Sequence, residues 1–140
     1  MSEQGPVFEL RLALTVDDYD KAFTFWHDAL GLPIAESWGE GEGRGAVLAA
    51  GKATIELLAP DAAANADRVE IGRQLNQPIR LALVVGDSAA VADRLSAAGA
   101  DRLGELVETP WHHRNIRLRS PEGLQLTLFT VLDGSARAAK

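Results

Sequence analysis

The chain has 140 residues, of which 46% are hydrophobic and 24% are charged, a composition ordinary for a single globular domain. Its formal net charge is −6 and it contains no cysteine. These features exclude disulfides and cysteine-based metal sites, and they argue against nucleic acid as a partner. There is also no signal-like start and no run of about 18 apolar residues that could cross a membrane. We therefore expect a cytoplasmic protein that binds neither nucleic acid nor a membrane.

A repeat divides the sequence into two similar halves. Residues 11–18 (RLALTVDD) recur as residues 80–87 (RLALVVGD), with six of the eight positions identical and an offset of 69 residues. Each copy is an apolar run that ends in aspartate and leads into a helical pattern. The sequence thus predicts one structural unit built twice, with any site at matching positions of the copies or between them.

The first copy begins with a strand over residues 8–16, in which one side of the strand is apolar. Asp17 or Asp18 can cap the helix that follows, because a carboxylate accepts hydrogen bonds from the first backbone N–H groups of a helix. Gly31 suits the end of this helix. The apolar stripe of the helix consists of Tyr19, Ala22, Phe23, Trp26 and Leu30.

The remaining predicted elements complete the first module and repeat its order in the second half of the chain. They are strands at about residues 34–38, 46–50 and 53–58, a polar connection over residues 60–77 with a short helix near 66–75, a strand at 79–85, a helix at about 88–99, and strands at about 103–108, 115–119 and 124–131.

We therefore predict an α+β fold in which residues 1–140 form a single domain of two tandem βαβββ modules. Module 1 spans about residues 8–59, module 2 spans about residues 78–131, and residues 132–140 form a tail that we expect to be frayed from residue 135 onward. Because the apolar side chains lie on one side of each strand, the helix of each module must cover one sheet face. The other face is left to line a concavity.

The order of these motifs resembles that of a known family. Residues 14–31 (LTVDDYDKAFTFWHDALG) are similar to the first strand–helix unit of the vicinal oxygen chelate superfamily, the group of glyoxalase I, bleomycin-resistance proteins and extradiol dioxygenases. Residues 55–58 (IELL) resemble its fourth strand, and residues 111–129 resemble its closing strand pair around a Ser-Pro-Glu-Gly turn. The resemblance implies curled mixed sheets around a ligand cavity, commonly in a homodimer.

In metal-dependent members of this superfamily, the resemblance implies four ligand positions on the first and fourth strands of each module. Here they correspond to Arg11, Glu56, Arg80 and Thr127. Arginine offers no lone pair to a metal, and one carboxylate and one hydroxyl fall short of the about three protein ligands that a zinc or iron site needs. We therefore predict no metal cofactor and reject the glyoxalase I and extradiol dioxygenase activities. A divalent metal held by Glu56 and histidines is the alternative.

Two interpretations of Arg11, Glu56 and Arg80 remain open. In the first, the three side chains form a structural salt-bridge cluster, with Glu56 between two arginines, since buried charges persist only when paired. In the second, one guanidinium is free to clamp a carboxylate, phosphate or enolate of a ligand through its bidentate fork.

Further ligand contacts are predicted around the same concavity. Trp38 and Trp111 lie at strand ends in matching parts of the two modules, where they either stack on a planar ligand or pack in the core. Gln125 and Thr127 on the inner face, and Asn115 at the rim, would add polar contacts. The adjacent His112 and His113 cannot both point into one cavity. Either one of them reaches the site as a general base, or the pair forms a solvated turn, which is the interpretation that we favour. 

The function that these residues favour is metal-independent binding of a small organic molecule, as in a glyoxalase/bleomycin-resistance-like binding protein. The alternative is an enzyme of the same superfamily, a lyase, isomerase or dioxygenase-like protein acting on a carbonyl or enolisable substrate. In that case Glu56 would be the catalytic base and an arginine would stabilise the oxyanion. The sequence leaves open whether the cavity forms within one chain or across a homodimer.

Overall fold

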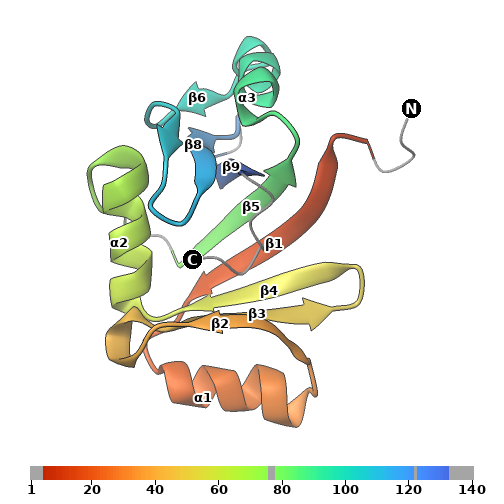
Figure 1. Ribbon diagram of the computed structural model, residues 1–140, viewed down its shortest axis with the longest axis vertical. Coiled ribbons are helices and arrows are strands. Elements are labelled where there is room, and N and C mark those ends of the chain that lie inside the picture. The colour runs from red at the N-terminus through yellow and green to blue at the C-terminus, as the bar shows by residue number, and fades with distance from the viewer. Residues whose placement is uncertain (1–4, 76–77, 122, 133–140) are drawn as a thin grey trace.

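The computed structural model describes residues 5–75, 78–121 and 123–132. In this part of the chain nine strands form one curled sheet (Figure 1), in the order β2-β3-β4-β1-β5-β9-β8-β6, with β7 also paired to β8. The β1–β4 and β5–β9 pairs are parallel, whereas the other pairs are antiparallel. The strands are β1 (Val7–Thr15), β2 (Ile34–Trp38), β3 (Gly45–Ala50), β4 (Ala53–Leu58), β5 (Ile79–Val85), β6 (Asp101–Arg102), β7 (Val107–Glu108), β8 (His113–Arg119) and β9 (Gln125–Val131).

The two halves of the sheet meet where β1 pairs with β5, and the sequence repeat is visible in this pairing. Leu12 lies opposite Leu81, its own counterpart 69 residues later. On one side of this pair Arg11 faces Ala82, and on the other side Ala13 faces Arg80. An approximate two-fold axis therefore passes through the Leu12–Leu81 pair and relates one module to the other.

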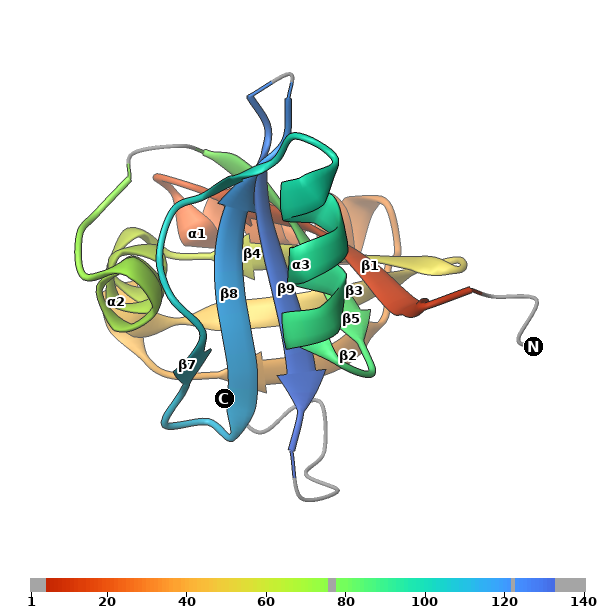
Figure 2. The ribbon, with the colours of Figure 1, turned by 90° about the horizontal axis from the view of Figure 1, so that it is seen from above.

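One helix of each module covers the outer face of the sheet, as Figures 1 and 2 show. These are α1 (Tyr19–Phe23), which continues as the π-helical segment η1 (Thr24–Ala29), and α3 (Ser88–Ala97). Both helices begin at an aspartate, because the side chains of Asp18 and Asp87 accept hydrogen bonds of 3.1 Å from the backbone N–H three residues later. The repeated aspartate of the sequence is thus a repeated helix cap.

The two faces of the sheet differ in chemistry. Beneath α1 lies an apolar core that contains Leu48 and Leu57, and beneath α3 lies a second core that contains Ile116 and Leu128. The inner face also buries its side chains, but many of them are charged, beginning with Arg11, which is fully buried on β1. Buried charges need partners, so the charged side chains of the inner face are expected to form ion pairs.

Helix α2 (Pro60–Ile71) connects the modules and corrects the predicted position of a short helix near residues 66–75. It begins earlier, at Pro60, because proline fits the first turn of a helix. A backbone N–H has no partner within the helix at that position, so the missing N–H of proline costs no hydrogen bond. It ends at Gly72, whose φ of 73° is readily adopted by glycine. In Figure 2, α2 and α3 lie on opposite sides of β8, so α2 flanks the inner face of the sheet.

The α+β fold with two modules is confirmed, with smaller differences at the element ends. The strand predicted over residues 103–108 is replaced by the two short strands β6 and β7. Most of the predicted tail, residues 133–140, lies outside the described residues. Among the residues that the structure describes, no helix combines the length and the apolar character needed to cross a membrane.

Candidate functional site

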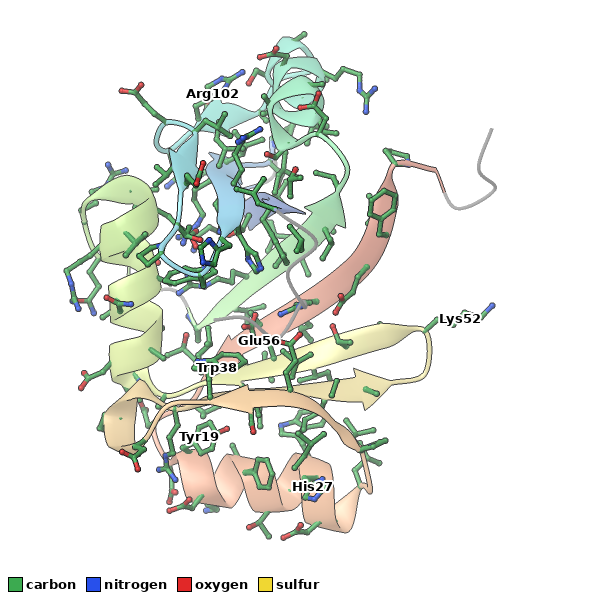
Figure 3. All side chains as sticks on the ribbon, viewed as in Figure 1. Tyr19, His27, Trp38, Lys52, Glu56 and Arg102 are labelled. Atoms are coloured by element: carbon green, nitrogen blue, oxygen red, sulfur yellow. The ribbon has the colours of Figure 1, made fainter. Side chains whose placement is uncertain are left out.

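A cavity of about 280 Å³ lies between the inner face of the sheet and α2. Ala13 on β1 and Ala82 on β5 line it at the centre of the sheet, where their small side chains leave space. Figure 3 shows Trp38 and Glu56 on this side of the sheet, whereas Tyr19 lies on the other side, beneath α1. A concave site with small central residues and a few polar groups is typical of a small-molecule pocket.

Aromatic side chains form much of the cavity wall. Trp38 from β2, Trp111 from the segment before β8, and Phe129 from β9 all line it. The imidazole of His113 stacks on Phe129, with ring centroids 4.6 Å apart and planes inclined by 20°. The two modules therefore each contribute at least one flat ring to the same cavity.

Six of the eight predicted site residues line this cavity, and two lie behind its wall. The six are Trp38, Glu56, Arg80, Trp111, Asn115 and Thr127. Of the other two, Gln125 accepts a hydrogen bond from Arg117, and Arg11 is enclosed by carboxylates. Neither of these two side chains is part of the cavity surface.

Arg11 is the centre of a buried ion-pair cluster in module 1. Its Nε donates to Glu9 Oε2 over 3.0 Å and its Nη2 donates to Glu36 Oε1 over 3.1 Å. Its Nη1 lies 3.9 Å from Glu56 Oε2, and its guanidinium carbon lies 5.4 Å from the centre of the Phe129 ring. Of the predicted cluster of Arg11, Glu56 and Arg80, the structure therefore brings together only the first two.

Arg80 belongs to a second buried cluster, which ties α2 to the sheet of module 2. Asp67 of α2 accepts hydrogen bonds of 2.9 Å from Arg80 and from Arg117 on β8. One turn later, Glu70 accepts bonds from Arg117 and from Asn115 Nδ2, the latter over 2.9 Å. All five side chains are buried, so α2 is held in place mainly by charged hydrogen bonds.

The protonation of Arg117 is set by these partners. Burial alone would lower the pKa of its guanidinium, but the charge and hydrogen bonds of Glu70 and Asp67 outweigh burial and raise the pKa above its ordinary value. Arg117 is therefore a permanent cation, and the two carboxylates of α2 are its counterions.

The histidine pair corrects the predicted solvated turn. His112 is exposed and has a φ of 65°, as expected for a turn residue. His113 is only 1% exposed and lines the cavity against Phe129. Adjacent side chains on a strand point to opposite faces, so only one of the two histidines can point inward. Because His112 lies in the turn, the inward side chain is that of His113.

Residues of α2 are the main part of the site that the sequence interpretation missed. Asp67, Glu70 and the cavity-lining Ala62 and Ala66 lie in a segment that was predicted to be a polar connection with a short helix near residues 66–75, and no part of the site was assigned to it. The available signal was their helical spacing, which places Ala63, Asp67 and Glu70 on one side of a helix. Without a known partner surface, this spacing does not distinguish a buried acidic side from a solvated one.

The donor set at the four family ligand positions does not fit a divalent metal ion. Two of the four positions are arginines, and the Glu56 carboxylate lies beside the Arg11 guanidinium, which would repel a dication. The fourth, Thr127, offers only a neutral hydroxyl. These side chains supply fewer than the about three anionic or imidazole ligands of a typical site.

Comparison with known proteins identifies the family. The family model described as Glyoxalase/Bleomycin resistance protein/Dioxygenase superfamily matches residues 10–128. The search among curated proteins found no match.

Solved structures share the fold at low sequence identity. A hypothetical protein from Bacillus halodurans has a TM-score of 0.66 and 17% identity, with 95% of this chain and 99% of that chain covered. Methylmalonyl-CoA epimerase from Mycobacterium tuberculosis has a TM-score of 0.65 and 22% identity, with coverages of 95% and 94%. A glyoxalase/bleomycin resistance protein/dioxygenase superfamily member from Vibrio splendidus has a TM-score of 0.62 and 14% identity, with coverages of 87% and 97%. At these identities the likeness concerns the fold alone.

Proposed function

We propose that this chain, which belongs to the Glyoxalase/Bleomycin resistance protein/Dioxygenase superfamily, binds a small organic molecule in the cavity between its modules without a metal ion. The observation that carries the proposal is the composition of the cavity wall. Trp38, Trp111 and Phe129 supply flat apolar surfaces, while Asn115 and Thr127 supply neutral hydrogen-bonding groups. This combination is typical of sites that bind by shape, stacking and a few polar contacts.

Independence from a metal follows from the chemistry of the four family positions. Arg11 supplies a permanent cation beside Glu56, and its bonds to Glu9 and Glu36 keep it there. A ligand of this chain would therefore be held by side chains and not through a shared metal ion.

The superfamily enzyme is the second candidate, and Glu56 is the observation in its favour. Its side chain is buried, it lines the cavity, and a carboxylate in such a place can act as a general base. However, of the two arginines considered as its electrophilic partner, Arg11 lies behind the cavity wall and Arg80 lines the cavity but is paired with Asp67. Binding without catalysis therefore requires fewer assumptions about this site.

The binding proposal is tested by titrating chelator-treated protein with a panel of planar aromatic compounds, including planar antibiotics. Binding is followed by tryptophan fluorescence and by calorimetry. A saturable 1:1 complex that forms in the presence of EDTA is the expected result. Failure of every compound to bind, or binding that requires added metal, would refute the proposal.

A variant that fills the cavity tests whether the ligand binds there. In Ala66→Trp, a large side chain on α2 fills space at the cavity wall, so we expect the affinity to fall by at least tenfold, about 1.4 kcal/mol. Arg68→Trp is the matched control, because Arg68 is exposed on the same helix and does not line the cavity. Equal loss in both variants would place the ligand elsewhere.

Two further expectations from the sequence remain proposals. We expect a homodimer, and sedimentation velocity should show a species with twice the mass of one chain. Three exposed apolar side chains support this expectation, those of Phe8, Phe25 and Leu30, since each exposes more than half of its surface and such side chains are often covered by a partner subunit.

We also expect a cytoplasmic location, which fractionation of the producing cells would test.

A further inference from the structure

The orientation of the Asn115 side chain is determined by its partner on α2. Its Nδ2 lies 2.9 Å from Glu70 Oε2, and a carboxylate can only accept a hydrogen bond. The amide must therefore point its nitrogen toward Glu70 and its oxygen away from it. Asn115 is 3% exposed, and its Oδ1 has no hydrogen-bond partner among the described residues.

Asn115 lines the cavity, and a ligand that displaces the atoms now covering this oxygen would meet a buried acceptor there. An unpaired buried acceptor is unfavourable, and a molecule that brings a donor to it removes the penalty. The complementary group of a ligand is an N–H or O–H, and a second carboxylate or ether oxygen at this point would be repelled.

Arg80 provides an unpaired donor in the same wall. Its Nη1 is bonded to Asp67, whereas its Nε is buried without a hydrogen-bond partner in the described part of the chain. Asp67 and Glu70 are one helical turn apart on α2, so the side chains that they anchor, Arg80 and Asn115, reach the helix about 5–6 Å from each other. A ligand with a donor and an acceptor on one edge would complement both groups, the donor at Asn115 Oδ1 and the acceptor at Arg80 Nε.

The charges around the cavity disfavour an anion. Three carboxylates line it, those of Glu56, Asp61 and Glu70, against the two guanidinium groups of Arg80 and Arg117. Both guanidinium groups are also bonded to Asp67. The arginines are therefore neutralised by the protein, and a carboxylate or phosphate ligand would meet an excess of negative charge.

We infer that the ligand is an uncharged planar ring that carries a lactam, an N–H next to a C=O on one edge. The N–H would donate to Asn115 Oδ1, the C=O would accept from Arg80 Nε, and the ring would lie against the aromatic walls. The inference rests on the proposed function, since it names the chemical class of the molecule bound in the same cavity.

The test compares three bicyclic probes of nearly equal shape by calorimetry on the full chain. 2-Quinolone has the lactam N–H, 1-methyl-2-quinolone lacks it, and quinoline-2-carboxylate replaces the lactam with an anion. We expect 2-quinolone to bind about tenfold more tightly than the methylated probe, which leaves Asn115 Oδ1 unpaired. We expect the carboxylate to bind more weakly still.

Two variants assign the preference to Asn115. In Asn115→Leu, a side chain of similar size without an acceptor, the tenfold ratio between 2-quinolone and its methyl derivative should fall to about one. Asn65→Leu is the control, because Asn65 lines the cavity from α2 but is exposed, and the ratio should persist. If Asn115→Leu does not fold, the three probes on the unaltered protein still decide the question.

The possible results separate this inference from the proposed function. Equal affinity for the two quinolones, or tighter binding of the carboxylate, would overturn the lactam assignment while leaving a small-molecule site in place. Persistence of the ratio in Asn115→Leu would also overturn it. No binding of any probe, together with no binding across the wider aromatic panel, would refute both.

Discussion

Arg80 and Arg117 donate their Nη1 hydrogens to the same atom, Oδ1 of Asp67, each over 2.9 Å. The two arginines come from different strands, β5 and β8, and the carboxylate comes from α2. One oxygen therefore ties the helix to two strands of the sheet, in addition to the bonds that Glu70 accepts. Since α2 forms one wall of the cavity, the shape of the site depends on this buried triad.

We expect Asp67→Asn to lower the free energy of unfolding by about 3 kcal/mol, because it leaves two buried guanidinium groups with one counterion fewer. Urea denaturation followed by circular dichroism measures the change. Asp93→Asn is the comparison, since the Asp93–Arg102 pair is exposed and such pairs contribute about 0–1 kcal/mol. A loss in Asp67→Asn no greater than in Asp93→Asn would show that the triad does not hold α2.

Trp38 is positioned by a glycine on the neighbouring strand. Gly45 lies opposite Trp38 in the β2–β3 pair, and a Cβ atom on Gly45 would come within 2.2 Å of the indole Cζ2. Gly45→Ala should therefore displace the indole from the cavity wall, destabilise the fold by about 1–3 kcal/mol and weaken ligand binding several-fold.

Tryptophan fluorescence and probe titration of Gly45→Ala measure these two effects. Gly86→Ala serves as the control, because its added Cβ would meet only Phe8, at an ordinary distance of 3.4 Å. Unchanged fluorescence and unchanged affinity in Gly45→Ala would mean that the indole does not depend on the space above Gly45.

Tyr19 is the only tyrosine of the chain, so its ionisation can be followed by ultraviolet absorbance. Burial raises the pKa of its phenol above the ordinary value of 10.0, the charge of Arg44 opposes this, and the charge of Asp20 adds to it. A raised pKa in the folded state favours the neutral phenol. The stability that it contributes is therefore complete below pH 10.0 and is lost as the pH rises through the folded-state pKa.

We expect the absorbance midpoint of the folded protein to lie above that of the urea-unfolded chain. Arg44 lies 4.5 Å from the centre of the Tyr19 ring, so Arg44→Gln removes the opposing charge and should move the midpoint still higher. A midpoint in the folded protein equal to that of the unfolded chain would contradict the burial of this phenol beneath α1.

The sequence repeat carried most of the information about the fold. The offset of 69 residues relates the apolar strands, the aspartate caps and the outer helices of the two modules, and it also relates Leu12 to Leu81 at the two-fold axis. Alternation along β1 and β5 was enough to place Arg11 and Arg80 on the inner face. These are local patterns with a fixed period, which a single sequence reveals.

The partners of the charged residues were not predictable in the same way. Glu9 and Glu36 neutralise Arg11, and Asp67 neutralises Arg80, over sequence separations that follow no period. Pairing of this kind depends on how α2 and β2 pack against the sheet. The acidic residues of α2 would have looked the same on a solvated helix. The position of the arginines and the pairing of Arg11 with Glu56 were therefore predicted, but the other partners were not.

The absence of a metal ion from the functional protein is the prediction that tests metal-independent binding most directly. Arg11 and Arg80 stand at two of the four family ligand positions, and Arg11 lies beside Glu56, the one carboxylate among them. After incubation with Fe²⁺, Mn²⁺, Ni²⁺, Co²⁺ or Zn²⁺ and desalting, we expect less than about a tenth of an equivalent of any metal in the untagged protein by elemental analysis, since too few ligands are present. Glu56→Ala should then behave like the unaltered chain. Near-stoichiometric metal that disappears in Glu56→Ala would instead show that Glu56 is a ligand, and a metal-dependent enzyme would become the leading interpretation.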